Sequence, residues 1–311
     1  MKTKIPLLLL LLLVISVSCS MTFPVAKATI KVVDELGNPI EGAKASISFE
    51  LSKVVSELGV TGSDGVFSAS HRTAIDIAFG AEKQGYYKSY GIYHFTTSKI
   101  GRWQPWNPEF TLVLRKIGNP VPMYACQLRT ITLPYANKNI GFDLIKYDWV
   151  PPYGKGEHAD FIFSLEGKYN NEYEFDNTLT LTFANKFDGI QLVAEDRKFG
   201  SRFKLPRFAP ETGYKNILTK SESRTPGQPY KSDSKKDNNY IFRIRSEEKN
   251  GKLLRAMYGK FQGDINFGVD RTRKISITFT PYLNPDYSRN LEFDPKQNLY
   301  KDLESFEHVG L

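Results

Sequence analysis

The densest group of residues that could do chemistry lies between Asp143 and Asp160, in the run D-L-I-K-Y-D-W-V-P-P-Y-G-K-G-E-H-A-D. This run places acidic side chains beside aromatic rings, around a rigid Pro-Pro pair and a flexible Gly-Lys-Gly. Two carboxylates that flank a sugar could perform the acid–base steps of a glycoside hydrolase. Carboxylates without that role, next to an exposed ring, would instead form a carbohydrate-binding face. The third interpretation is an ordered loop whose rings pack on the domain and whose charges stay in water.

The candidate ligand-binding residues in this run are two carboxylates, two aromatic rings and an imidazole: Asp148, Trp149, Tyr153, Glu157 and His158. If the loop binds a ligand, Trp149 or Tyr153 should be exposed, because stacking needs an accessible ring face. If the loop is only structural, Trp149 should be buried and its ring N–H should donate to a carbonyl. No residue is assigned a catalytic role.

Other chemistry has little support in the sequence. The four histidines are widely separated and form no zinc-binding motif: His71, His94, His158 and His308. A second acidic cluster, Asp286, Glu292 and Asp294, fits no calcium-loop spacing. The sequence therefore predicts neither a metal nor a cofactor. It favours a non-enzymatic protein, with a secreted glycan-acting hydrolase as the alternative.

The N-terminus predicts export. Two lysines precede an apolar run, Ile5–Val17, which is too short to span a bilayer and has the layout of a secretory signal over residues 1–18. Small residues before Cys19 resemble the lipobox of bacterial lipoproteins, although that family prefers Leu where this chain has Ser16. The resemblance implies an acylated Cys19, a membrane lipid anchor and a place in the bacterial cell envelope.

Ordinary signal cleavage is the alternative, near Ser18 or Ser20 or after Ala26 or Ala28, and it would give a periplasmic or secreted protein. If Cys19 is acylated or lost, Cys126 has no disulfide partner, and we expect it to be a small buried core residue.

Charge does not point to a nucleic acid. The formal net charge is +8, and removal of the two signal lysines leaves 40 basic against 34 acidic residues, or +6. Basic and acidic residues are interspersed along most of the chain, which is typical of a mixed solvated surface. We expect no nucleic-acid partner.

The elements that precede the acidic run predict a β-sandwich. A β-branched run in Ile30–Ser48 enters a Gly-Asn-Pro turn and leaves as an alternating strand, which predicts a hairpin. T-G-S-D-G-V-F follows at Thr61–Phe67, then K-Q-G-Y-Y from Lys83, and T-L-V-L closes the unit at Thr111–Leu114. Short strands separated by turn residues are the pattern of a sandwich.

Taken in this order, these motifs resemble the carboxypeptidase regulatory-like, transthyretin-type β-sandwich over residues 28–114. The resemblance implies a small non-catalytic module of the kind found in secreted enzymes, surface receptors and adhesion proteins. No functional residue carries over, because the shared positions are turn glycines, a turn proline and core apolar residues. We assign the module to residues 27–116.

A linker at residues 117–123 leads to a second domain at residues 124–311, which resembles only uncharacterised secreted bacterial proteins. Its candidate strands predict an all-β, sandwich-like fold: Ile140–Tyr147, Asp160–Leu165, Leu179–Phe183, Ile190–Val193, Tyr240–Arg245, Leu254–Phe261 and Ile275–Tyr282. Asn250-Gly251 predicts a tight hairpin turn. Only Leu299–Glu307 could be helical.

The polar stretch Lys220–Asn239 has almost no apolar residues, and we expect a mobile surface loop there. The whole sequence thus predicts an all-β, exported, envelope-associated binding or assembly protein, whose partner is a carbohydrate or another envelope protein.

Overall fold

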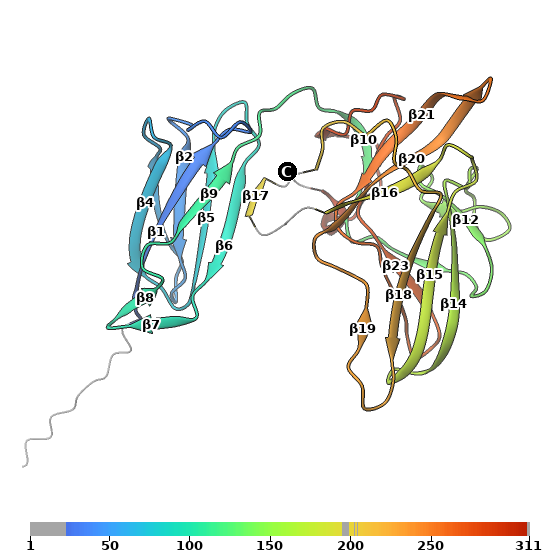
Figure 1. Cartoon of the computed structure of the whole chain (residues 1–311), viewed down its shortest axis with the longest axis horizontal. Coiled ribbons are helices and arrows are strands. Elements are labelled where there is room, and N and C mark those ends of the chain that lie inside the picture. The colour runs from blue at the N-terminus through green and yellow to red at the C-terminus, as the bar shows by residue number, and fades with distance from the viewer. Residues whose placement is uncertain (1–22, 195–198, 202, 204, 310–311) are drawn as a thin grey trace, which may run out of the picture.

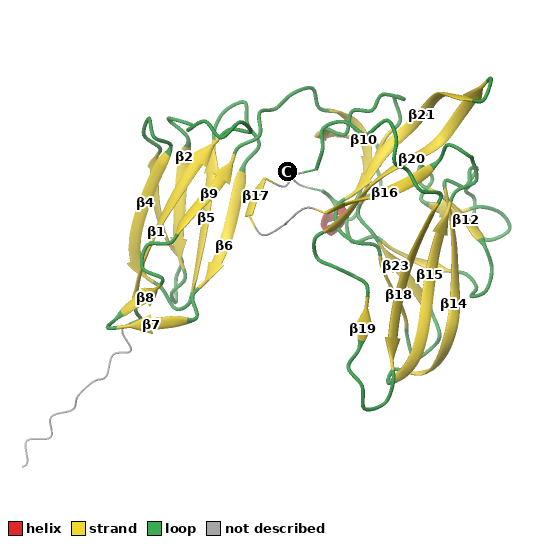
Figure 2. Cartoon of the chain, in the orientation of Figure 1, coloured by secondary structure: helices red, strands yellow, loops and turns green. Residues whose placement is uncertain are grey.

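The computed structural model describes residues 23–194, 199–201, 203 and 205–309. Within these residues the one helical element is a 3₁₀ turn, η1 (Ser305–Glu307), and the all-β prediction is confirmed (Figure 2). The rest of the candidate helix at 299–307 is irregular. No helix in the described part of the chain is long and apolar enough to cross a membrane. The predicted signal and Cys19 lie outside the described residues.

Two sheets form the first domain (Figure 1). In the first sheet β1 is central, antiparallel to β4 and parallel to β8 and β9, with β7 outside β8. Its strands are β1 (Val25–Val33), β4 (Val66–Arg72), β7 (Thr97–Lys99), β8 (Arg102–Gln104) and β9 (Glu109–Val113).

The second sheet has the order β17-β6-β5-β2-β3. Its strands are β2 (Lys44–Phe49), β3 (Val55–Val60), β5 (Asp76–Glu82), β6 (Ser89–His94) and β17 (Phe199–Ser201). Because side chains alternate along β2, Ala45, Ile47 and Phe49 all point into the core that this sheet shares with the first sheet. The predicted β-sandwich is confirmed, with an additional strand that comes from far along the chain.

The predicted hairpin at Ile30–Ser48 is wrong in one respect. The strands on either side of the Gly-Asn-Pro turn, β1 and β2, do not pair with each other but lie in different sheets. Both sides of β1 are already occupied, by β4 and by β8 and β9. The turn is therefore a crossover between sheets, and the Asp34 carboxylate holds it by accepting the N–H groups of Leu36 and Asn38.

Three sheets form the second domain. The first has the order β16-β20-β21-β24-β10-β25, the second β13-β12-β14-β15-β18-β19 and the third β11-β23-β22. Their strands are β10 (Val121–Ala125), β11 (Thr130–Leu133), β12 (Ile140–Asp143), β13 (Asp148–Trp149), β14 (Phe161–Asn171), β15 (Glu174–Thr182), β16 (Gly189–Ala194), β18 (Ile217–Arg224), β19 (Lys231–Ser232), β20 (Asn238–Lys249), β21 (Lys252–Phe261), β22 (Asn266–Val269), β23 (Ile275–Thr278), β24 (Pro281–Asn284) and β25 (Phe293–Asn298).

Phenylalanine rings from the first two of these sheets and from the connection after β23 meet in one core. Phe161 and Phe163 of β14 pack against Phe242, Phe261 and Phe279 in edge-to-face, tilted and stacked contacts. Such contacts add to the free energy gained by burial and fix the relative positions of the sheets. Cys126 lies fully buried at the same core, as expected, and burial raises the pKa of its thiol to about 12.

The predicted turn at Asn250-Gly251 is confirmed. Both residues have positive φ, +55° and +75°, and they join β20 to β21. These values are those of the tight turns that match the twist of a hairpin, and Asn and Gly adopt them at least cost.

The stretch Lys220–Asn239 contains more regular structure than its composition predicts. It begins inside β18, includes β19 and ends in β20. Lys220 is buried because its ammonium group pairs with the Asp264 carboxylate at 2.9 Å. The mobility of the remaining exposed loop stays a prediction.

Candidate functional site

The acidic run at 143–160 is a loop held from inside by its own carboxylates. Asp143, at the end of β12, accepts backbone N–H groups from residues 145, 146, 157 and 158. Asp148 accepts the N–H groups of Trp149 and Lys155 at 2.8 Å each. Both carboxylates therefore fix the loop backbone.

Arg245 of β20 completes this arrangement from a different sheet. Its guanidinium donates two hydrogen bonds to Asp160, at 2.7 and 2.8 Å, and one to Asp143 at 2.9 Å. Arg245 has a φ of +49° and lies where the pairing of β20 with β21 shifts register. A bulge of this kind redirects a side chain, and here it aims Arg245 at the two acids.

These contacts set the charge states of the two acids. Burial opposes ionisation of Asp143, but its backbone N–H donors and Arg245 outweigh burial and lower the pKa. Asp160 is more deeply buried, and burial raises its pKa in spite of Arg245. Both carboxylates are turned inward, to Arg245 and to the backbone N–H groups of the loop.

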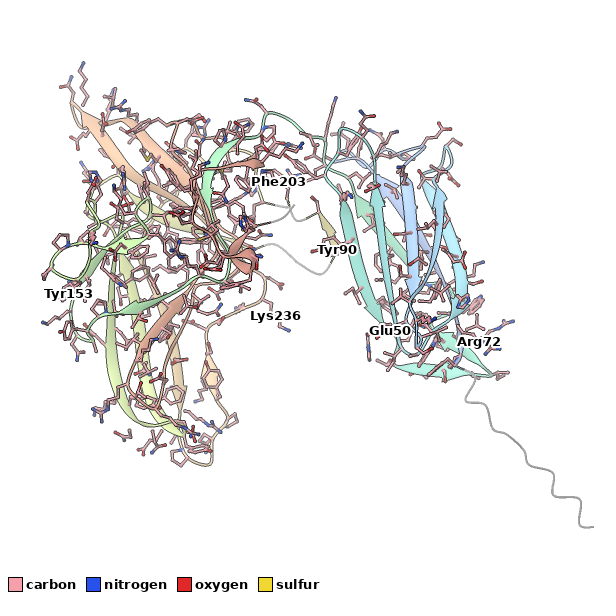
Figure 3. The ribbon with its side chains drawn as sticks, turned by 180° about the vertical axis from the view of Figure 1, so that it is seen from behind. Glu50, Arg72, Tyr90, Tyr153, Phe203 and Lys236 are labelled. Carbon is pink, nitrogen blue, oxygen red and sulfur yellow. The ribbon has the colours of Figure 1, made fainter. Side chains whose placement is uncertain are left out.

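The structure separates the five predicted ligand-binding residues. Trp149 is 7% exposed and packs edge to face on Phe142, so its ring offers no stacking platform. Tyr153 is half-buried, at the outer edge of the second domain (Figure 3), with its ring centroid 5.5 Å from that of Tyr135. Tyr135 is exposed, and sequence analysis missed it because it precedes the acidic run.

The two remaining predicted residues, Glu157 and His158, are exposed. Glu157 pairs with Lys146 at 3.0 Å. That this loop binds a ligand stays a prediction, and of its two predicted rings only Tyr153 is partly accessible. Among the described residues, no three metal-ligating side chains come together in one group.

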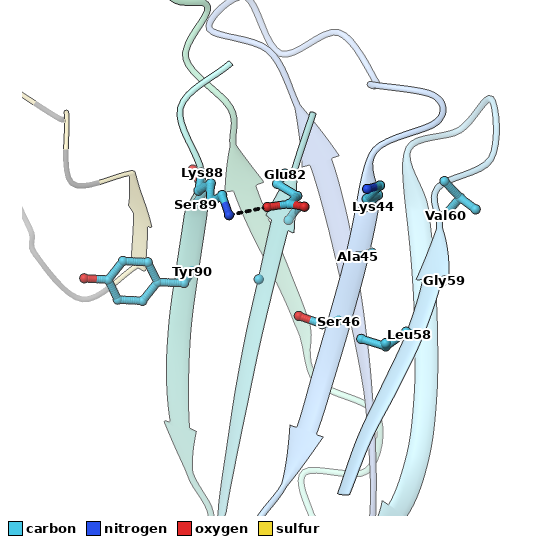
Figure 4. A pocket seen from close by; sticks show the side chains of 12 residues that line it. Lys44, Ala45, Ser46, Leu58, Gly59, Val60, Glu82, Lys88, Ser89 and Tyr90 are labelled. Carbon is cyan, nitrogen blue, oxygen red and sulfur yellow. Dashed lines mark ion pairs between the residues drawn. The ribbon is translucent and has the colours of Figure 1, made fainter. Parts of the chain in front are cut away.

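A second candidate site lies on the outer face of the first domain, across β3, β2, β5 and β6 (Figure 4). A cleft of about 590 Å³ follows the two central strands. Its floor consists of small side chains, Ser46 on β2 and Gly80 on β5, which are direct partners across the sheet. On the same row the floor is bounded by Leu58 of β3 and Tyr90 of β6.

The adjacent rows differ from this one. Beyond the cleft, Ser48 and Ala78 lie between Ile92 of β6 and the small Ser56 of β3. On the other side of the cleft the two central strands carry Lys44 and Glu82.

Leu58, Val60 and Ile92 are 76%, 63% and 60% exposed. These exposed apolar side chains stand on both sides of the small central residues, which makes this face a candidate contact surface. We call this feature the sheet trough.

The sequence does carry a signal for the sheet trough. In β3 the alternating positions Leu58 and Val60 are apolar although the strand is at an edge of its sheet. Without knowledge of which face is inward, that alternation is equally consistent with a core-facing strand. Only the folded structure shows that Leu58 and Val60 face outward.

The junction between the two domains is built on Glu292, a residue that sequence analysis considered only for calcium. Its carboxylate accepts the Tyr87 hydroxyl at 2.7 Å, the N–H groups of Gly118 and Asn119, and the Arg207 guanidinium at 2.9 Å. A Cβ on Gly118 would lie 2.7 Å from the Glu292 carboxylate, so a larger residue there would displace that side chain.

Glu35 extends the junction on the side of the first domain. It pairs with Arg115 at 2.9 Å and with Arg207 at 3.0 Å. Phe203, which Figure 3 places between the domains, stacks on Tyr87 with ring centroids 5.1 Å apart. Together with the pairing of β17 to β6, these contacts join the two domains.

Comparisons with known proteins identify no family. No protein-family model matches the chain, and no curated protein matches it. Membership of the carboxypeptidase regulatory-like family therefore stays a prediction, while the β-sandwich itself is confirmed.

Several solved structures are similar at a low level, among them two pilins and a candidate carbohydrate-binding protein. The shaft pilin spaA of Lactobacillus rhamnosus GG is 9% identical, with 77% of this chain and 94% of that chain covered and a TM-score of 0.24. BcpA, the major pilin subunit of Bacillus cereus, is 9% identical, with 83% and 68% covered and a TM-score of 0.23. A candidate carbohydrate-binding protein of Bacteroides uniformis is 15% identical, with 82% and 97% covered and a TM-score of 0.19. Similarity at this level carries no argument about function.

Proposed function

We propose that this chain is an exported, envelope-associated protein that binds a partner and does not catalyse a reaction. The observation that carries the proposal is that most carboxylates of the run 143–160 are already bound to other groups of the chain. A glycoside hydrolase needs two carboxylates that can face a sugar. Here Asp143 and Asp160 are committed to Arg245, and Asp148 is committed to the loop backbone. Only Glu157 of the four acids stays exposed, and it pairs with Lys146.

Hydrolysis can be tested directly. Purified protein incubated with a panel of polysaccharides should release no reducing ends, and Glu157→Gln should not differ from the wild type. Release of sugar by the wild type that is lost in Glu157→Gln would overturn the proposal in favour of a hydrolase.

The proposal includes an anchor on Cys19, which rests on the sequence alone. Several acyl chains hold a protein at a membrane where one holds it only marginally, so an acylated Cys19 should resist extraction by salt. We expect wild type in the membrane fraction and Cys19→Ala in the soluble fraction of a bacterial host. An unmodified N-terminus downstream of Cys19, found by mass spectrometry, would contradict the anchor and leave export standing.

The exposed Tyr135 and the half-buried Tyr153 support a carbohydrate as one ligand class. Lys138 lies over the Tyr135 ring at 4.8 Å from its centroid, so a sugar would stack on the rest of that ring. Glu157 and His158 of the same region are polar groups that could orient the sugar. Tyr135→Ala should abolish any glycan binding seen on an array. Tyr173→Ala is the matched control, because Tyr173 and Tyr135 are both 55% exposed. Equal binding by both variants would exclude this loop as the site.

A further inference from the structure

The sheet trough has the dimensions of one extended chain. Neighbouring strands lie about 4.8 Å apart, so β3 and β6, separated by β2 and β5, are about 14 Å apart. Leu58 leans from β3 over the floor, and Tyr90 bounds the floor on β6 with its ring directed away from it (Figure 4). The floor that Leu58 leaves open spans about two strand spacings, about 10 Å, which is narrow for a helix of 10–12 Å with its side chains. An unbranched chain fits it.

The floor gives that chain nothing polar to pair with except serine hydroxyls. The backbone N–H and C=O groups of β2 and β5 are used in pairing with their neighbours on both sides. Ser48 already pairs its hydroxyl with that of Ser56 at 2.7 Å. A sugar or a peptide would leave its own polar groups unpaired over such a surface, whereas a hydrocarbon chain has none.

The two ends of the sheet trough differ in charge. Lys44 and Lys88 stand at one end around a single acid, Glu82, which pairs with Lys88. Lys44 also acts on Glu82, because the pKa of Glu82 is lowered first by Lys88 and then by Lys44. At the other end Asp76 pairs with His94 at 2.8 Å. The first end therefore attracts an anion, and the second end does not.

From this geometry we infer that the sheet trough binds a single-chain amphiphile with an anionic head, a free fatty acid carboxylate. The carboxylate lies at Lys44, and the alkyl chain runs between Leu58 and Tyr90 toward Ile92. The cleft runs from Lys44 to Ser46, about 7 Å of strand, which takes about six carbons because an extended chain advances about 1.2 Å per atom. The rest of a twelve-carbon chain continues over Ser48 and Ala78, the next row of the same face. This site is separate from the loop at 143–160 and does not depend on it.

Dodecanoate, kept below its micelle concentration, is the probe, and isothermal titration calorimetry on the whole mature chain is the measurement. Ser46→Phe fills the floor from an outward-facing strand position, so the core is untouched. We expect it to weaken binding at least tenfold. Thr111→Phe, on the outward face of β9 in the opposite sheet, is the matched control and should bind as the wild type does. Far-ultraviolet circular dichroism checks that both variants fold.

The head group is tested with the uncharged glycerol ester of the same acid. Wild type should bind dodecanoate more tightly than the ester. Lys44→Glu should weaken dodecanoate binding by about tenfold and leave binding of the ester unchanged. Three outcomes would overturn the inference. The first is that Ser46→Phe binds dodecanoate as tightly as wild type does. The second is that wild type binds phospholipid vesicles but not free dodecanoate. The third is that the chain does not bind dodecanoate and self-associates, and that Ser46→Phe abolishes the self-association. The last outcome would make the face an interface between copies.

Discussion

At the scale of single residues, Arg245 connects the acidic loop to the core of the second domain. Asp143 and Asp160 are each 1% exposed in their side chains, and Arg245 is the cation that pairs with both. Removal of one partner from a buried ion pair is costly because it leaves charge unpaired in a dry environment.

Arg245→Ala should therefore lower the free energy of unfolding of the second domain by about 3–5 kcal/mol, measured by urea denaturation. Arg255→Ala is the matched control on the adjacent strand, where Arg255 pairs with Glu247 in solvent. We expect that control to leave the free energy of unfolding nearly unchanged. Equal effects of the two substitutions would mean that the loop does not depend on Arg245.

Lys260 is a second residue with a measurable consequence. It is buried, donates to the Leu291 carbonyl at 2.8 Å and lies over the rings of Phe203 and Tyr282. Burial, followed by the nearby Arg115, lowers its pKa to about 7, although Glu292 opposes the shift.

A lysine whose pKa is lower in the folded state binds fewer protons there than in the unfolded state. Its contribution to stability is therefore greatest at high pH and is lost as pH falls toward about 7. We expect the free energy of unfolding of wild type to rise from pH 7 to pH 9 relative to that of Lys260→Met. The difference between the two proteins isolates this lysine from other titrating groups. A difference that is constant with pH would contradict a depressed pKa.

At the scale of elements, β17 is a strand of the first domain's second sheet that is supplied by a distant part of the chain. It is separated by more than a hundred residues from β6, its partner, and covers an edge that would otherwise be open. Unpaired edges invite pairing with other chains. Expression of residues 23–116 alone should give a folded sandwich that associates through β6.

The measurement is light scattering coupled to size exclusion. The same fragment with Gly91→Pro, which removes a pairing group from β6, should stay monomeric if it folds. The full-length chain should be monomeric under the same conditions. A monomeric unmodified fragment would show that β17 is not needed to cover this edge.

How much the sequence could predict differs between elements. Alternation and turn residues locate part of the strands, because side-chain period and turn chemistry are local, as at Asn250-Gly251. The candidate strand at 275–282 is wrong in its extent, since it is two strands, β23 and β24, of different sheets, and the predicted linker at 117–123 contains the start of β10. Strand partners are not local. Nothing in the run from Ile30 to Ser48 states that β1 and β2 separate into two sheets, and nothing near residue 200 points to β6.

The same distinction applies to the candidate sites. The loop at 143–160 is continuous in sequence, so its residues could be named, but the burial of Trp149 depends on the sheets around it. The partner of its acids, Arg245, is far away in the chain. The sheet trough joins residues of four strands, and its floor is defined by the absence of large side chains.

At the scale of the whole molecule, Glu292 determines how the domains respond to acid. Burial raises its pKa, but Gly118, Tyr87, Asn119 and Arg207 together lower it below the usual value. A carboxylate with a depressed pKa stabilises the folded state above its unfolded pKa, and this stabilisation is lost as pH falls through the folded pKa. Glu35 behaves in the same way, through Arg115 and Arg207.

We therefore expect the junction to loosen below about pH 4, where carboxylates begin to protonate. Small-angle X-ray scattering at pH 7 and pH 3 should show a larger radius of gyration in acid for wild type. Glu292→Gln should already show the larger radius at pH 7, while Glu247→Gln, on an exposed hairpin, should follow wild type. A compact Glu292→Gln at pH 7 would mean that β17 alone holds the domains together.

The placement of β17 also orders events in time. If the chain is exported, as we propose, and moves with its N-terminus first, β1 to β9 emerge from the membrane well before residues 199–201. Over that interval the first sandwich has its core but not its last strand, and β6 faces whatever chaperone or neighbour is present. Completion of the first domain coincides with delivery of the second, so the two halves of this protein become mature together.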